Sequence, residues 1–496
     1  MPLRNPTQLW LSLDGLGTLQ EQIYRALVDR ITRGDLAAGT RLPSTRALAN
    51  DLDVSRTTSQ AAYDQLIAEG YVDTRRGSGS FVATELPELR ARVPRRTRAR
   101  QPIGVRWSTY AQRIVDANLG SPFDAIQGQR PARLELLYGI PDPRLFPTAD
   151  WRRAVSAHTS HMSARAIAYG PPAGMRRLRS AIRDYLSRAR GIECDAEQIV
   201  IVAGTQHGLQ LVTRMLCDSG SRVLIEHPWY PAARNVMLAE GVEPVSVPVD
   251  EHGANLDAVD TSTLSDCAMA YVTPSHQFPT GAVMSYRRRQ QLLAWAGRTG
   301  AFVFEDDYDG EFRFRGRPVP SLRAMDDSGR VIYAGTFSKT LFPALRIGYL
   351  IVPPELVQMT CSVRWAAGWS NPTLEQAALT DFIVGGGFER HVRRTRTAYA
   401  RRRAVLLDAL ARHLGDKVSV SGGAAGLHVL ATVHEQPHGG VPALIERARD
   451  HGVGLYSMAN CFEPGSERSG LVLGYSLLNP EELADAVAII ADCWDR

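Results

Sequence analysis

The sequence predicts a multidomain chain, with a small helical module at the N-terminus and a larger α/β module after it. Residues 1–84 carry apolar side chains at helical spacing, followed by a short glycine-rich stretch. From residue 131 onward, short apolar runs alternate with helical stretches. The length of 496 residues is enough for two or more domains, and the hydrophobic content of 44% is enough for a core in each.

The N-terminal module has the order of a winged helix-turn-helix. A first helix is predicted by apolar residues at helical spacing, namely Leu19, Ile23, Leu27 and Ile31. Ser44 and Ser55 stand where two further helices begin, because a serine hydroxyl accepts hydrogen bonds from the exposed amides of a helix start. The second of these helices is expected to run from Arg56 to about Glu69. Two short strands around a glycine-rich tip then form the wing.

The helix starts and the wing of this module carry residues suited to DNA. Arginine and hydroxyl side chains at helix N-termini reach phosphates and base edges, and glycines let the wing backbone approach closely. The DNA-binding residues that we predict are Arg41, Ser44, Arg46, Ser55, Arg56, Thr57, Thr58, Gln60, Gly77 and Gly79. The expected partner is double-stranded DNA, and this binding should weaken as salt rises.

Residues 85–130 are irregular and basic, and we predict a linker there. Six arginines lie between positions 90 and 100, and Pro87, Pro94 and Pro102 prevent a long helix. Two roles stay open for this positive charge. It either helps to hold DNA phosphates or keeps the segment extended by repulsion.

The module of residues 131–496 is predicted to hold a mostly parallel sheet. Its apolar runs are typical of strands that are buried on both faces. These runs are 199–202, 222–225, 269–272 and 301–304. No leader-like segment and no run of 18 apolar residues occurs, so we expect a soluble, cytoplasmic protein without membrane contact. The six cysteines form no paired motif and the histidines show no ligand spacing, so no metal is predicted.

Lys339 is the predicted catalytic residue. Of the 57 lysine and arginine residues, only Lys339 and Lys417 are lysine. An arginine stays protonated near neutral pH, whereas a lysine amine can lose its proton and condense with an aldehyde. Lys339 therefore indicates nucleophilic chemistry. The aldehyde cofactor that suits its neighbours is pyridoxal 5'-phosphate (PLP).

Other residues suit the ring and the phosphate of that cofactor. Either Asp306 or Asp307 would pair with the ring nitrogen, and the spacing to Lys339 and Tyr308 favours Asp306. We place Tyr308 at the phenolic oxygen of the ring and Tyr230 against its face. Free amides at a helix start, hydroxyls and a guanidinium all bind phosphate. This phosphate set comprises Gly204, Thr205, Gln206, Thr336, Ser338 and Arg346.

Two resemblances extend these predictions. The motifs Arg41–Arg46, Ser55–Thr58, Glu69–Tyr71 and Gly77–Val82 closely resemble the GntR-type winged-helix regulators. About residues 135–496 resemble the type I aminotransferases, with matches at Gly139–Asp142, Gly204–Gln206, Pro279–Gly281, Asp306, Tyr308, Ser338–Lys339 and Arg346. The second resemblance implies the type I fold of PLP-dependent transferases and an internal aldimine on Lys339. It also implies that Tyr169 reaches the phosphate across a dimer interface.

Both modules on one chain resemble the MocR/GabR-type regulators. This resemblance implies a PLP-dependent transcriptional regulator rather than an enzyme, forming a homodimer on an operator with repeated half-sites. It would sense PLP itself, as in the PdxR branch, or a small amine-type effector through the Lys339 aldimine. Two alternatives stay open: an active aminotransferase with an appended DNA-binding head, and a repressor with a relic cofactor site.

Two positions depart from the aminotransferase pattern. Phe278 stands where an asparagine usually contacts the ring oxygen, and Val472 stands where an arginine clamps the substrate carboxylate. Loss of one charge-assisted hydrogen bond costs about 1.5–3 kcal/mol, unless Arg234 or Arg468 replaces the missing arginine. We therefore hypothesise that the effector is not an α-amino acid held in the usual way.

Overall fold

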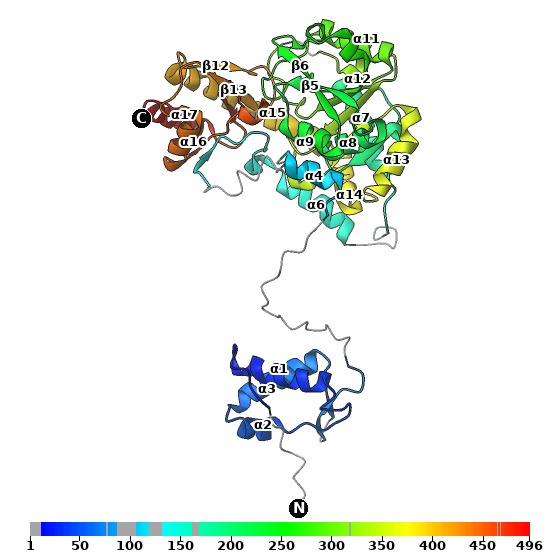
Figure 1. The fold of residues 1–496 in the computed structure, drawn as a ribbon, viewed down its shortest axis with the longest axis vertical. Coiled ribbons are helices and arrows are strands. Elements are labelled where there is room, and N and C mark those ends of the chain that lie inside the picture. Colours follow the sequence, from blue (N-terminus) through cyan, green and yellow to red (C-terminus); the bar gives the residue numbers. More distant parts are fainter. Residues whose placement is uncertain are drawn as a thin grey trace, which may run out of the picture. The chain divides into compact units, whose positions relative to one another are not determined.

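The computed structural model describes residues 11–75, 78–86, 106–117, 119, 131–160, 168–316, 319–463, 465–466 and 468–496. The chain divides into two compact units between Val105 and Arg106 (Figure 1). None of the helices in the described ranges is both long and apolar enough to cross a membrane.

The N-terminal unit is a winged helix-turn-helix, as predicted. It consists of three helices and an antiparallel two-stranded wing: α1 (Leu19–Thr32), α2 (Thr45–Asp51), α3 (Arg56–Ala68), β1 (Val72–Arg75) and β2 (Gly79–Val82). Its core joins Ile23 and Leu27 of α1 to Leu66 of α3. The buried Tyr63 hydroxyl donates to Pro43 O at 2.9 Å, which ties α3 to the segment before α2.

A short helix, α4 (Thr109–Asp116), lies within residues 85–130, where the sequence predicted an irregular linker. Ser108 caps α4 by accepting from Ala111 N at 3.2 Å. The helix packs against α9 (Pro231–Glu240), and Arg113 Nη1 donates to Ser219 Oγ at 3.3 Å. Residues 106–117 thus belong to the larger unit. The arginine-rich stretch 90–100 lies outside the described residues.

The larger unit is built on an eight-stranded sheet with the order β4-β11-β10-β9-β8-β5-β6-β7. The strands are parallel except β11 and β7, which run antiparallel to their neighbours. Their bounds are β4 (Ile199–Val202), β5 (Arg222–His227), β6 (Glu243–Asp250), β7 (Gly253–Ala254), β8 (Cys267–Val272), β9 (Phe302–Asp307), β10 (Val331–Thr336) and β11 (Gly348–Ile351). The four apolar runs identified in the sequence lie on β4, β5, β8 and β9, except that Ala301 precedes β9 by one residue.

Helices cover both faces of this sheet, which is why its strands are apolar throughout. Alternate residues of a strand point to opposite faces: Val200 packs with α8 and α9, whereas Ile201 packs with α7 and α14. The helices around the sheet are α6 (Thr148–Thr159), α7 (Arg176–Arg190), α8 (Thr205–Leu216), α10 (Thr261–Ser265), α11 (Tyr286–Thr299), α12 (Leu322–Met325), α13 (Val357–Ala366) and α14 (Thr373–Val384).

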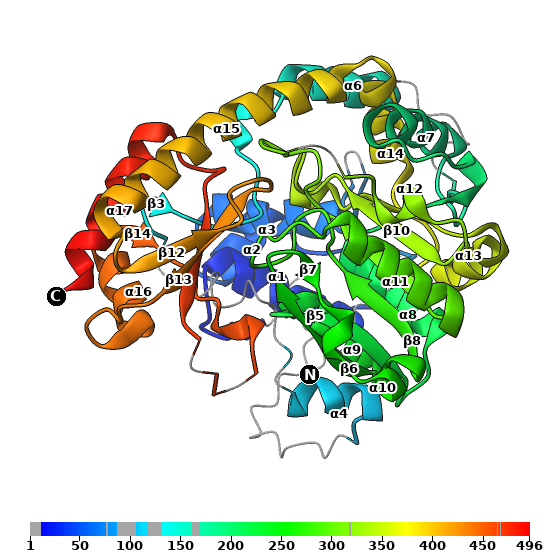
Figure 2. The same cartoon turned by 90° about the horizontal axis from the view of Figure 1, so that it is seen from above.

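A smaller lobe completes the larger unit. The long helix α15 (Gly387–Leu414) runs from α14 to this lobe and packs on α17 (Pro480–Trp494) (Figure 2). The lobe holds an antiparallel sheet of β12 (Val418–Ser421), β13 (His428–Val433) and β15 (Gly470–Gly474). Two short parallel strands, β3 (Leu134–Glu135) and β14 (Val453–Gly454), and α16 (Gly440–Asp450) complete it. This architecture places β13 beside the large sheet, where its first residue, His428, lines the candidate site.

Candidate cofactor site and DNA-binding surface

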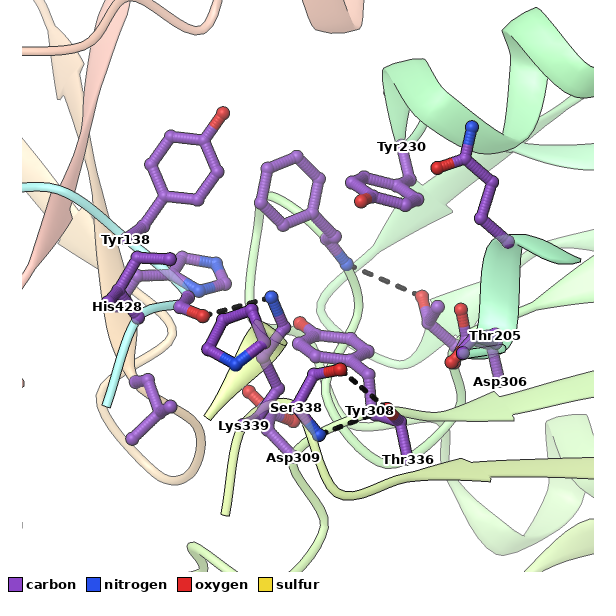
Figure 3. Close-up of a pocket in the computed structure, with 18 of the residues that line it drawn as sticks. Tyr138, Thr205, Tyr230, Asp306, Tyr308, Asp309, Thr336, Ser338, Lys339 and His428 are labelled. Atoms are coloured by element: carbon purple, nitrogen blue, oxygen red, sulfur yellow. Dashed lines mark hydrogen bonds between the residues drawn. The ribbon is translucent and has the colours of Figure 1, made fainter. Parts of the chain in front are cut away.

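A cavity of about 170 Å³ lies at the carboxyl ends of the parallel strands (Figure 3). This is where ligands bind in open α/β sheets. Ten of the eleven predicted cofactor residues line it, all except Tyr169. They are Gly204, Thr205, Gln206, Tyr230, Asp306, Tyr308, Thr336, Ser338, Lys339 and Arg346.

Lys339 lies in the loop that follows β10, and its half-buried side chain lines the cavity (Figure 3). Nζ donates to Gly139 O at 2.9 Å. Burial lowers the pKa of the amine, while the nearby carboxylates of Asp309 and Asp306 oppose this shift. A lowered pKa increases the fraction of uncharged amine, which is the nucleophilic form.

Asp306 and Asp307 are neighbours at the end of β9 but have different partners. Asp306 lines the cavity and accepts from the Tyr271 hydroxyl at 2.8 Å, while its Oδ1 is buried and has no hydrogen-bond partner among the described residues. Burial raises the pKa of Asp306 to about 7. Asp307 forms an ion pair with Arg190 and accepts from the Tyr333 hydroxyl at 2.6 Å. Of the two, Asp306 presents its carboxylate to the cavity.

The opposite end of the cavity is suited to an anion. Helix α8 begins after Gly204, whose φ of +95° strains any residue with a Cβ. A Cβ on Gly204 would lie 3.4 Å from Arg346 Nη1, so this glycine lets the guanidinium approach the helix start. First-turn amides of a helix lack intrahelical acceptors and favour anions. Thr336 Oγ1 and Ser338 Oγ, joined at 3.0 Å, add hydroxyls on the loop before the lysine.

Aromatic rings form one wall of the cavity. The ring centroid of Phe278 lies 5.4 Å from that of Tyr138 and 5.2 Å from those of Tyr230 and His428. Rings at these distances are in attractive contact. Tyr138, Tyr271 and His428 were not among the predicted site residues. They come from separate segments, and a lone aromatic residue in an apolar stretch carries no local signal of a site.

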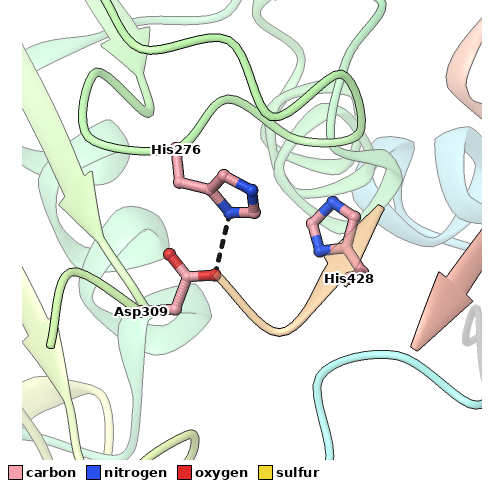
Figure 4. Close-up of side chains that lie close together, drawn as sticks. All are labelled: His276, Asp309 and His428. Carbon is pink, nitrogen blue, oxygen red and sulfur yellow. Dashed lines mark hydrogen bonds and ion pairs between the residues drawn. The ribbon is translucent and has the colours of Figure 1, made fainter. Parts of the chain in front are cut away.

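His276, Asp309 and His428 form a buried polar cluster beside the cavity (Figure 4). Their possible ligand atoms lie within 4.8 Å of one another. His276 Nδ1 lies 2.9 Å from Asp309 Oδ2, and the Tyr308 hydroxyl donates to His276 O at 2.9 Å. Burial lowers the pKa of His428 well below its usual value, so its ring is neutral near pH 7. This cluster holds the Asp309 carboxylate at the cavity wall, and no sequence spacing indicates it because three distant segments supply its members.

Tyr169 is the one predicted cofactor residue that does not line the cavity. Its side chain is 81% exposed, and its ring stacks on Trp369 with the centroids 4.6 Å apart. Trp365 is exposed too and lies 5.8 Å from Trp369. The three residues Tyr169, Trp365 and Trp369 form an exposed aromatic patch. The role of Tyr169 across a dimer interface stays a prediction.

Val472 occupies an apolar setting. It lies buried on β15, opposite Leu430 of β13, and both belong to an apolar cluster that includes Phe278. The remaining buried members of this cluster are Met458, Cys461 and Phe462.

Arg234 and Arg468, the two arginines that could replace the missing carboxylate-binding arginine, contact other residues. Arg234 lies over the Trp229 ring at 4.5 Å and pairs with Glu463 at 3.8 Å. Arg468 lies over the Phe462 ring at 5.7 Å. Neither arginine lines the cavity.

In the N-terminal unit, the predicted hydroxyls act as helix caps. Ser44 Oγ accepts from Ala47 N at 3.2 Å and begins α2, and Ser55 Oγ accepts from Thr58 N at 3.1 Å and begins α3. Ser55 Oγ also lies 2.7 Å from the Thr57 hydroxyl. Capping therefore explains these serines without excluding contact with DNA.

The predicted DNA-binding arginines of this unit lie on its surface. Arg46 and Arg56, in the first turns of α2 and α3, are exposed, as is Gln60, which donates to Asp64 Oδ1 at 2.7 Å. Arg41 lies beside the wing, where it bridges to Phe81 of β2 and its guanidinium approaches Gly79. Gly77 lies outside the described residues.

Comparisons with known proteins identify both units. Residues 19–82 match the model of bacterial regulatory proteins of the gntR family, and residues 139–460 match that of aminotransferase class I and II. The probable rhizopine catabolism regulatory protein MocR of Rhizobium meliloti is 37% identical over 489 residues, which cover 97% of this chain and 94% of that protein. The chain belongs to the MocR-type transcriptional regulators.

Other proteins agree with this MocR-type architecture. The pyridoxine biosynthesis transcriptional regulator PdxR of Corynebacterium glutamicum is 31% identical, over 96% of this chain and 94% of that one. The α-aminoadipate aminotransferase LysN of Thermus thermophilus shares the fold of the larger unit, with a TM-score of 0.70 and 27% identity over 78% of this chain and 97% of that one. The predicted combination of a GntR-type DNA-binding module with a class I/II aminotransferase fold, acting in transcription regulation, is thereby confirmed.

Proposed function

We propose that this MocR-type regulator holds PLP in the cavity around Lys339 and that the state of the cavity sets the affinity of the winged helix for DNA. The observation that carries the proposal is a half-buried lysine amine that lines the same cavity as the Asp306 carboxylate. The Asp306 Oδ1 atom lacks a partner among the described residues, so an N–H group of a ligand would satisfy it.

The donor set of the cavity fits each part of PLP. When bound, PLP supplies an aldehyde that reacts with primary amines and a ring that draws electrons while its nitrogen is protonated. Lys339 provides the amine, and Asp306 holds the proton at the ring nitrogen. The first amides of α8 and Arg346 bind the phosphate. Phe278 and its aromatic neighbours shield the ring from water.

DNA control follows from differential affinity for two states of the protein. A ligand shifts an equilibrium between states only if it binds one of them more tightly. We propose that PLP, or an amine effector that joins it, favours one arrangement of two winged helices on repeated half-sites. The two copies would come from a homodimer, for which the exposed patch around Tyr169 and Trp369 is the candidate surface.

The proposal is tested by borohydride reduction of the PLP-treated protein and peptide mapping by mass spectrometry. The chain carries its own control, because Lys417 is the other lysine and differs in its setting. The Lys417 amine pairs with Asp495 at 2.5 Å, which raises its pKa and keeps it charged. We expect the label on Lys339 alone. Equal labelling of both lysines, or none on Lys339, would refute a specific site.

The same PLP-treated protein distinguishes a regulator that responds to PLP from a repressor whose cofactor site no longer affects DNA binding. Operator binding is measured by fluorescence anisotropy with PLP-loaded wild type and with Lys339→Ala. A PLP-dependent change in DNA affinity is expected in wild type and should be absent in the variant. Identical affinities with and without PLP in wild type would mean that the cavity does not control the DNA-binding module.

A further inference from the structure

Within the described residues, the cavity offers few positive charges to a second ligand. Its charged lining residues are Asp306, Asp309, Lys339 and Arg346. Arg346 lies at the start of α8, at the anion end, and the Lys339 amine is held at Gly139 O. Because Asp306 pairs with the ring nitrogen in the proposed function, Asp309 is the charged lining residue left for a second ligand, with no further arginine or lysine among the described lining residues.

The wall beside that space is apolar. Phe278 and Tyr138 line the cavity and pack on the cluster that contains Val472 and Leu430. Val472 is buried on β15 behind the cavity lining, in the same apolar cluster as the lining residue Phe278, and carries no polar group. Arg234 and Arg468, which could have replaced the missing carboxylate-binding arginine, lie over the rings of Trp229 and Phe462 and do not line the cavity.

A ligand that carries a carboxylate would bind weakly in this cavity. Its anion would lose water without gaining a guanidinium, which is costly in a buried site. It would also share the site with the Asp309 carboxylate, and like charges repel. A ligand whose one charged group is an ammonium avoids both costs and is attracted by Asp309.

We infer that the effector of this cavity is a small primary amine without an acidic group, and that Phe278 with the apolar cluster of Val472 behind it sets this preference. This rests on the proposed function, because the amine joins a PLP-loaded cavity. It deepens that function by naming a chemical class that excludes α-amino acids.

Matched ligand pairs that differ only in a carboxylate test the inference. Calorimetry on PLP-loaded, full-length protein compares ethanolamine with serine and phenethylamine with phenylalanine, and anisotropy follows the affinity for operator DNA. We expect the amine of at least one pair to bind about tenfold or more tightly than its amino acid, since one unmade charge-assisted hydrogen bond is worth that factor. The same amine should change DNA affinity. An amino acid that binds as tightly as its amine in each pair would overturn the inference.

Two variants of Val472 test whether this position sets the preference for amines. Val472→Arg should gain roughly tenfold in affinity for the amino acids, whereas Val472→Met, which alters size without charge, should keep the preference for amines. Because the wild-type comparison is decisive alone, a variant that fails to fold removes no information. Borohydride labelling of the same sample distinguishes the two failures. A labelled Lys339 with preferred amino acids refutes only this inference, and an unlabelled Lys339 refutes the proposed function itself.

Discussion

Replacing Asp306 by asparagine should change cofactor affinity and protein stability in opposite directions. The carboxylate is buried, and burial raises its pKa from 3.8 to about 7. A shift of this size, at about 1.4 kcal/mol per unit, corresponds to about 4 kcal/mol between the ionised and neutral forms. Asparagine removes the buried charge but keeps the shape and a carbonyl that accepts from Tyr271.

The sign of the pH effect follows from the raised pKa. A carboxyl group whose pKa is higher in the folded state stabilises the fold fully below its unfolded pKa, and this contribution is lost as pH rises through the folded pKa. Cofactor-free wild type should therefore lose up to a few kcal/mol of unfolding free energy between about pH 4 and pH 7 through Asp306. Asp306→Asn should lack that loss and be more stable above pH 7.

Cofactor binding should respond the other way. The variant loses a charge-assisted hydrogen bond to the ring nitrogen, worth about 1.5–3 kcal/mol, so PLP should bind about tenfold to a hundredfold more weakly. Calorimetric melting of the apo-protein at several pH values gives the stability, and PLP titration followed by absorbance gives the affinity.

Asp307→Asn is the matched control. Asp307 pairs with Arg190 and accepts from Tyr333, so this variant leaves a buried guanidinium without its counter-charge and should destabilise the apo-protein by about 3–5 kcal/mol. Opposite stability changes in the two variants are expected. If both variants are destabilised equally, or if Asp306→Asn binds PLP like wild type, the assignment of Asp306 to the ring nitrogen is wrong.

Three further changes have expected outcomes. Arg56→Ala should weaken operator binding at least tenfold and leave PLP binding unchanged. It should also reduce the slope of log affinity against log salt concentration by about one. Arg33→Ala, which removes an equal charge at the end of α1, should bind the operator like wild type in the same anisotropy assay. Gly204→Ala places a Cβ at φ +95° beside Arg346, so PLP titration should show roughly tenfold weaker binding. Tyr169→Ala should raise the dimer dissociation constant in sedimentation experiments, and an unchanged constant would place the interface elsewhere.

Much of the fold was predictable because its signals are local. The run 199–202 coincides with β4, and serine caps mark the starts of α2 and α3. Helix α4 was missed because it is only eight residues long and follows a stretch in which proline and arginine dominate. Its stability comes from packing on α9, and no local pattern reports such a contact.

The site divides in the same way. Lys339 was identified because lysine is rare in this chain, and Asp306 because an acidic residue follows an apolar strand. Both residues line the cavity. Tyr138 and His428 reach it only because the smaller lobe brings them beside the large sheet. The spacing favoured Asp306 over Asp307, but the sequence alone did not show which of the two faces the cavity. Consecutive side chains of a strand point to opposite faces, so the orientation of β9 decides this.

The packing of α4 on α9 also shortens the stretch of sequence between the two units. Residues 87–105 separate the described part of the N-terminal unit from Arg106. By covalent geometry alone, such a length spans at most about 70 Å, less than half of what a stretch continuing to residue 130 would allow. In the homodimer that we propose, this upper bound restricts the distance between half-sites that both winged helices can occupy at once.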